Sequence, residues 1–125
     1  GAGSYFLPGN IHLRMAMYIS DVMQNARGFR IKSDGEIVGR QTATSLQGVI
    51  CGKPAVFLDD EYLPNGFDVL DRLVPIGQVL AMETYPDIMF APVRFQTGFG
   101  TPDPMKPSSR ARPCAVIAVW TKRKF

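Results

Sequence analysis

Apolar residues recur at helical spacing in the first quarter of the chain. Between positions 14 and 26 they follow one another mostly at spacings of three and four, at Met15, Ile19, Val22, Met23 and Ala26. This period places them on one face of a helix. Gly28 follows, and glycine commonly ends helices because it adopts left-handed backbone angles without strain. The pattern predicts one amphipathic helix over residues 14–26.

Three apolar runs predict strands. They cover residues 54–59, 79–85 and 114–121, and they are rich in β-branched and aromatic residues. Runs of this kind, bounded by Gly or Pro, are typical of buried strands. Pro54 fits the first position of such a strand, because proline lacks the N–H group that a central ladder position needs. We expect the first and third runs to be neighbours in one sheet.

Shorter elements lie between these runs. Residues 29–32 and 36–38 flank the turn sequence Ser33-Asp34-Gly35, and this predicts a β-hairpin. Residues 67–73 predict a short helix, because their apolar positions share one helical face. The predicted fold class is α+β, with a small mixed β-sheet and a helix packed on one face.

A chain of 125 residues fits one domain. We expect residues 1–13 to form an extended N-terminal arm, with Tyr5 and Phe6 as aromatic anchors for a partner. Residues 14–125 are expected to form the single domain. The longest apolar run, residues 115–120, is far shorter than the ~20 residues that a spanning helix needs, so we predict no transmembrane segment.

Charge is concentrated at the end of the chain. The net charge is +3, and the cationic residues near the end are Arg110, Arg112, Lys122, Arg123 and Lys124. No aromatic residues interleave with them in a strand pattern and no recognition-helix motif is present, so we predict no nucleic-acid partner. These cationic residues, together with Tyr5 and Phe6, are the predicted partner-binding residues. Lipid head groups are a further candidate contact.

Cys51 and Cys114 stand at the starts of the first and third apolar runs. If these runs are neighbouring strands, a disulfide ties their entrances together, and the chain then belongs outside the reducing cytosol. A disulfide between Cys51 and Cys114 would close the long loop between them and stabilise the fold by ~4 kcal/mol. Two separate buried thiols are the alternative, because free cysteine is commonly buried.

Candidate catalytic and ligand-binding residues are few. His12 is the only histidine, and its place on the expected arm is poorly suited to hold a base within hydrogen-bond reach. Asp59, Asp60 and Glu61 form the densest acidic group, but they lack the spacing of a calcium loop, so we interpret them as a turn. We predict no enzymatic activity, no metal and no cofactor, and keep a hydrolase using His12 as an alternative.

Four segments resemble the plug domain of TonB-dependent outer-membrane receptors. Residues 16–29 are similar to its opening helix and the turn that follows, and residues 73–85 to its helix-to-strand passage. The sequence at 51–59, CGKPAVFLD, resembles a plug strand, and CAVIAVWTK at 114–122 resembles the closing strand. The segments follow the family's order and span residues 16–122. The resemblance implies a plug-like fold and a periplasmic location.

The chain also departs from this family. Asp60 replaces the usual Gly after the strand aspartate, and Pro86-Asp87 replaces a Gly-Pro pair. No segment resembles the receptor's partner-binding box, and the chain stops at Phe125, where a receptor would start its first barrel strand. We therefore expect the plug fold without the transport role.

The sequence favours a non-enzymatic, periplasmic interaction module. In this interpretation the protein is a structural or accessory subunit of a larger integral-membrane assembly, such as a transporter or a respiratory or photosynthetic complex. The alternative is an excised plug domain of a TonB-dependent transporter, which gates a barrel and contacts iron chelates, cobalamin or glycans.

Overall fold

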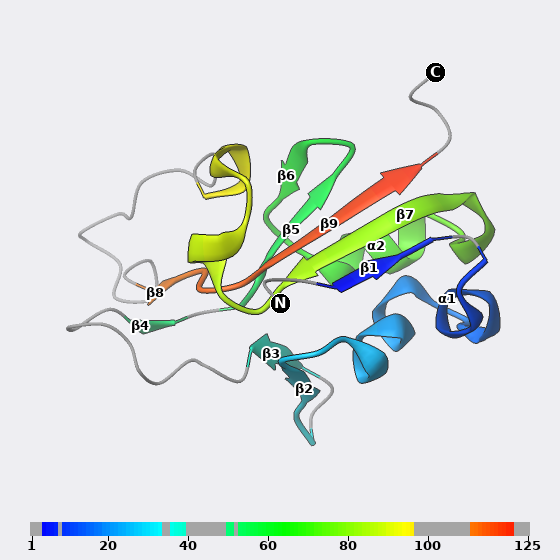
Figure 1. Ribbon diagram of the computed structural model, residues 1–125, viewed down its shortest axis with the longest axis horizontal. Helices are drawn as coiled ribbons and strands as arrows, with labels where there is room; N and C mark the ends of the chain where they lie inside the picture. The colour runs from blue at the N-terminus through cyan, green and yellow to red at the C-terminus, as the bar shows by residue number, and fades with distance from the viewer. Residues whose placement is uncertain are drawn as a thin grey trace.

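Figure 1 shows the computed structural model of the protein. It describes residues 4–7, 9–33, 36–39, 50–51, 53–96 and 111–121, and at 50–51 and 111–112 the description covers the backbone. The strands are β1 (Ser4–Phe6), β2 (Phe29–Ile31), β3 (Ile37–Gly39), β4 (Ile50–Cys51), β5 (Ala55–Leu58), β6 (Glu61–Leu63), β7 (Val79–Tyr85), β8 (Ala111–Arg112) and β9 (Val116–Thr121). The helices are α1 (Ile11–Met15), η1 (Ile19–Asn25), α2 (Phe67–Leu73), η3 (Ile76–Gln78), η4 (Ile88–Phe90) and η5 (Val93–Phe95), those marked η being 3₁₀.

Strand β9 is the centre of a five-stranded sheet with the order β1-β7-β9-β5-β6. It pairs in parallel with β5, whereas the other neighbouring pairs of the sheet are antiparallel. Figure 1 shows β5, β9 and β7 running side by side through the middle of the molecule. The α+β class and the mixed sheet are thus confirmed, as is the expected pairing of the runs at 54–59 and 114–121.

Side chains alternate along β9 between two cores. Ile117 and Val119 belong to the larger core, which lies between the sheet and the helices α1, η1 and α2. Val116 and Ala118 belong to a smaller core on the opposite face, where η4 and η5 pack. All four side chains are at most 1% exposed. A strand buried on both faces needs a continuous apolar run, which is why this segment shows no alternation of polar and apolar residues.

The single helix predicted over residues 14–26 is in fact two helices. α1 ends at Met15, Ala16 is extended with ψ of 145°, and η1 then begins at Ile19. The break follows from Asp21, whose carboxylate accepts hydrogen bonds from backbone N–H groups in the linking residues. Its Oδ2 lies 3.2 Å from the nitrogen of Met17 and 2.9 Å from that of Tyr18. A carboxylate that satisfies these donors starts a new helix in place of continuing the old one.

The apolar face predicted for that helix is correct over η1 and wrong over α1. The side chains of Ile19, Val22, Met23 and Ala26 are buried in the larger core. Met15 is 78% exposed, because the break at Ala16 changes the direction in which the first turn presents its side chains. Leu13 anchors α1 to the core instead.

Three local predictions are confirmed. β2 and β3 form the expected antiparallel hairpin, and α2 covers residues 67–73 as predicted. Asp59 and Asp60 form the tight turn between β5 and β6, with φ of 51° and 73°. Two residues of positive φ are the signature of a hairpin turn whose twist matches its strands. The Asp59 carboxylate accepts from the backbone nitrogen of Thr121 at 2.9 Å, which ties this turn to the end of β9.

The N-terminal segment differs from the extended arm expected over residues 1–13. β1 is an edge strand of the sheet, and Phe6 lies opposite Met82 of β7. Phe6 is 4% exposed and belongs to the larger core. The expectation that Phe6 binds a partner is therefore corrected: backbone pairing with β7 directs its side chain inward.

Gly28 has no room for a side chain. Its φ is +85°, and a Cβ atom there would lie 2.5 Å from Cβ and 2.7 Å from Cγ of Pro86. We predict that Gly28→Ala lowers the free energy of unfolding by about 2 kcal/mol, because it combines backbone strain with overlap against a rigid ring. Urea denaturation measures the effect. Gly77→Ala is the matched control, since nothing lies within 4 Å of a Cβ there, and an equal loss in both variants would contradict this account.

Two buried threonines provide a second test. Thr84 Oγ1 is buried and has no hydrogen-bond partner in the part of the chain that the structure describes, whereas Thr121 Oγ1 donates to Asp59 Oδ2 at 2.8 Å. We predict that Thr84→Val raises the free energy of unfolding by about 1 kcal/mol, because it removes a buried polar group that gains no bond. Thr121→Val should lower it by about 2 kcal/mol. Thermal denaturation measures both changes. Equal changes in the two variants would contradict the difference between the Thr84 hydroxyl, unpaired among the described residues, and the paired Thr121 hydroxyl.

Candidate functional site

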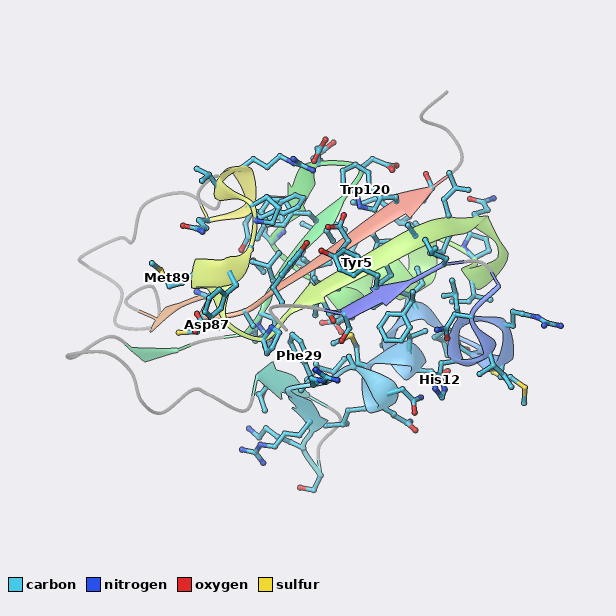
Figure 2. The ribbon with its side chains drawn as sticks, in the orientation of Figure 1. Tyr5, His12, Phe29, Asp87, Met89 and Trp120 are labelled. Atoms are coloured by element: carbon cyan, nitrogen blue, oxygen red, sulfur yellow. The ribbon has the colours of Figure 1, made fainter. Side chains whose placement is uncertain are left out.

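A cluster of aromatic side chains and one carboxylate lies on the sheet face that carries the smaller core. Its members are Tyr5 on β1, Glu83 and Tyr85 on β7, and Trp120 on β9. Tyr5 lies directly opposite Glu83 in the sheet register, and Trp120 lies opposite Ala81. Figure 2 shows Tyr5 and Trp120 above the strands. Three strands that are distant in sequence therefore bring these groups together.

Glu83 is the acceptor at the centre of this cluster. Its Oε2 accepts from Trp120 Nε1 at 2.7 Å, and its Oε1 accepts from the Tyr85 hydroxyl at 2.7 Å. The Tyr5 and Tyr85 hydroxyl oxygens are 3.1 Å apart. Because Tyr85 has a single phenol proton and gives it to Glu83, Tyr5 is the donor in that third bond.

The surroundings of Tyr85 keep its phenol protonated. Burial raises the pKa of Tyr85 well above its ordinary value, and the hydrogen bonds with Tyr5 and Glu83 and the negative charge of Glu83 raise this pKa further. Both carboxylate oxygens of Glu83 already accept strong bonds. The cluster is thus suited to hold β1, β7 and β9 together and poorly suited to proton transfer near neutral pH.

Arg94 covers the outer side of the aromatic cluster. Its guanidinium carbon lies 4.6 Å from the ring centroid of Phe95 and 5.8 Å from that of Trp120. Its Nε lies 3.0 Å from Asp60 Oδ1, in an exposed ion pair. Exposed ion pairs contribute little to stability, so the contacts with the rings are the larger part of what Arg94 supplies.

A pocket of about 550 Å³ lies between η1, β3 and the start of α2. Its polar lining consists of Ser20, Glu36, Lys53, Asn65, Asp68 and Asp71. The two Asp71 oxygens accept from the backbone nitrogen of Ser20 at 3.0 Å and from its hydroxyl at 2.5 Å. This pair holds η1 against α2, so these two polar residues of the pocket lining already have a structural role.

Two groups of large apolar side chains remain in solvent. The first, here named the α1 cluster, consists of Leu7, Ile11, Met15, Met17 and Tyr18. The second, the η4–η5 cluster, consists of Met89, Phe90 and Val93. Every member is more than half exposed. In Figures 1 and 2 the helix α1 with His12 and the turn with Met89 lie towards opposite ends of the molecule. Contiguous exposed apolar groups commonly mark interaction sites.

The predicted partner-binding residues differ in exposure and in how far the structure describes them. Tyr5 is exposed on the edge strand β1, while Phe6 is buried. Arg112 belongs to β8, whose description is limited to the backbone. The other four, Arg110, Lys122, Arg123 and Lys124, lie outside the described residues.

The backbone brings the two cysteine positions close together. β4 and β8 pair in parallel with Cys51 opposite Arg112, two positions before Cys114 along the chain. No free cysteine is found among the described residues. The side chain of Cys51 is outside the description, so the disulfide stays a prediction.

Other sites considered from the sequence have simple local settings. His12 is exposed on α1, where the Asn10 side chain caps the helix by accepting from the His12 backbone nitrogen at 2.8 Å. Among the described residues, no group of three His, Cys, Asp or Glu side chains is arranged to hold a metal ion. None of the helices in the described ranges is long and apolar enough to cross a membrane.

Sequence reasoning missed most of the α1 cluster and the role of Glu83. The extended arm expected over residues 1–13 includes Leu7 and Ile11, although the spacing of four between Ile11 and Met15 is a helical signal. Glu83 stands two positions before Tyr85 in a predicted strand, and side chains two apart in a strand share a face. That alternation was the available sign that the two side chains meet.

No family model, curated protein or solved structure matches this chain. The resemblance to receptor plug domains therefore stays a prediction drawn from the sequence.

The raised pKa of Tyr85 gives a direct spectroscopic test. A raised folded-state pKa contributes stability below the ordinary pKa of tyrosine, and this contribution is lost as the pH rises above it. We predict that wild type and Tyr85→Phe show the same alkaline rise in phenolate absorbance while folded. After denaturation in urea, the rise in wild type should exceed that in Tyr85→Phe by the absorbance of one phenolate. A difference already present in the folded state would show that Tyr85 ionises normally.

Proposed function

We propose that this protein is a non-enzymatic, periplasmic interaction module that docks, as a structural or accessory subunit, on a larger integral-membrane assembly. The observation that carries the proposal is the η4–η5 cluster. Met89, Phe90 and Val93 stand in solvent on two consecutive single-turn helices beside the sheet.

The framework beneath this cluster is well ordered. Asp87 caps η4 by accepting from the backbone nitrogen of Met89 at 3.0 Å, and the Gln96 side chain donates to the carbonyl of Ala91 at 2.9 Å. Ala91 and Phe95 are buried in the smaller core. Because these inward contacts fix both turns, the exposed side chains cannot turn inward without breaking them. A partner can therefore bind a preorganised surface, which lowers the cost of association.

The chemistry of the η4–η5 cluster is that of a protein interface. Methionine, phenylalanine and arginine are enriched at interface centres, and Arg94 lies next to Val93. A methionine side chain adapts its shape to a partner, whereas the phenylalanine ring supplies a rigid anchor. Exposed Tyr5 and the cationic residues near the chain end are further proposed contacts, with acidic partners or lipid head groups.

The proposed location rests on the cysteines and on the resemblance to plug domains. Pairing of β4 with β8 brings the chain near Cys51 and Cys114 together, as a disulfide requires. Such a bond is typical of proteins outside the cytosol. We propose kinship with the plug fold on the same residues, without the transport role.

The docking proposal predicts a specific loss in one surface variant. We expect tagged wild-type protein, extracted from native membranes in mild detergent, to migrate with a large complex on size-exclusion chromatography. Phe90→Gln should reduce its share in that complex about tenfold, because it removes a central apolar anchor. Mass spectrometry of the complex would then identify the partner.

Leu73→Gln is the matched control, since Leu73 is equally exposed but lies at the end of α2, outside the η4–η5 cluster. It should leave the elution unchanged. Recovery of the wild-type protein as a monomer in the soluble fraction would refute the docking proposal. So would equal losses in both variants.

A further inference from the structure

The α1 cluster has a different chemical setting from the η4–η5 cluster. Leu7, Ile11, Met15, Met17 and Tyr18 come from one short stretch that leads from β1 through α1 to η1. Leu13 holds α1 to the core from the inner side, while Ile11 and Met15, four residues apart, point out together. The exposed side chains thus come from one continuous stretch of twelve residues, 7–18, with α1 at its centre.

Charge in this region is cationic. Residues 7–18 hold the cation Arg14 and contain neither Asp nor Glu, and Asp21 is the first acidic residue of the whole chain. Its carboxylate is occupied by the backbone nitrogens of Met17 and Tyr18. α1 packs mainly on η1 and η3, and η3 brings no acidic residue. Of these two elements, only η1 carries a carboxylate, that of Asp21.

The α1 cluster lies at one end of the long axis of the molecule (Figure 1). The described pocket of about 550 Å³ is lined by other segments. Protruding flexible side chains suit a soft surface that needs no matching shape. Exposed apolar residues that stand with a cation and a tyrosine are typical of segments that lie in the interface of a lipid bilayer.

From these observations we infer that the α1 cluster is a membrane-contacting surface for anionic phospholipid. Ile11, Met15 and Met17 enter the boundary between head groups and acyl chains, and Arg14 reaches the phosphates, because its long stem allows the guanidinium to stay in the polar layer. The inference stands apart from protein docking through the η4–η5 cluster, because each surface has its own residues.

Vesicle flotation tests this assignment on the purified protein. We expect binding to phosphatidylcholine vesicles that contain phosphatidylglycerol, much weaker binding to phosphatidylcholine alone, and a decline with added salt. The double variant Ile11→Gln/Met15→Gln should weaken binding about tenfold, because it removes two inserted apolar groups. Arg14→Glu should weaken binding to the anionic vesicles alone.

The control is Met89→Gln/Phe90→Gln, which removes similar apolar groups from the η4–η5 cluster and should bind vesicles like wild type. All variants change exposed residues, and their melting temperatures verify that the fold is intact. A second measurement uses Tyr18→Trp. After subtraction of the wild-type signal, its emission should shift to shorter wavelength when anionic vesicles are added.

Three results would overturn the assignment. The first is no binding to anionic vesicles and no emission shift. The second is equal weakening by the α1 and the η4–η5 double variants. The third is the absence of vesicle binding together with a dimer, or a complex with a protein partner, that Ile11→Gln/Met15→Gln abolishes. The α1 cluster would then be a protein interface.

Discussion

Burial of β9 on both faces is the constraint on which this fold depends. Ile117 and Val119 face one core and Val116 and Ala118 face the other, so two separate layers must cover a single strand. β5 runs parallel to β9 as its neighbour, and a parallel pair needs a long connection. That connection supplies α2 to one face and η4 and η5 to the other. The position of the η4–η5 cluster follows from this arrangement.

Elements whose signals are local were predictable from the sequence. Strand β7 and helix α2 have the predicted bounds, because apolar period and flanking Gly or Pro define them. The break after Met15 was not predictable from period alone, since it depends on which donors the Asp21 carboxylate selects. β1 was missed because its partner strand is distant: the hydroxyls of Tyr5 and Tyr85, 80 positions apart, are in contact. A pairing over that separation leaves no periodic trace in a three-residue strand.

The surfaces were harder to predict than the core, because the same residue types serve in both. Met82 is fully buried in β7, whereas Met89, a few residues later, stands in solvent. The difference lies in the backbone: Met82 faces the larger core from a central strand, while the Asp87 cap directs η4 outward. Composition therefore shows that residue types suited to an interface are present. The packing of the backbone decides which of these side chains are exposed.

The shortness of β1 has a consequence for how copies of this protein behave towards one another. β1 supplies three residues to cover the flank of β7, which is seven residues long. If the first residues detach, β7 presents an open row of amide and carbonyl groups beside an empty Phe6 site. Such a flank is a template for the same segment of a second molecule, so the two could exchange N-termini. The hydroxyl contact between Tyr5 and Tyr85 stabilises the pairing of β1 with β7 and so opposes segment swapping.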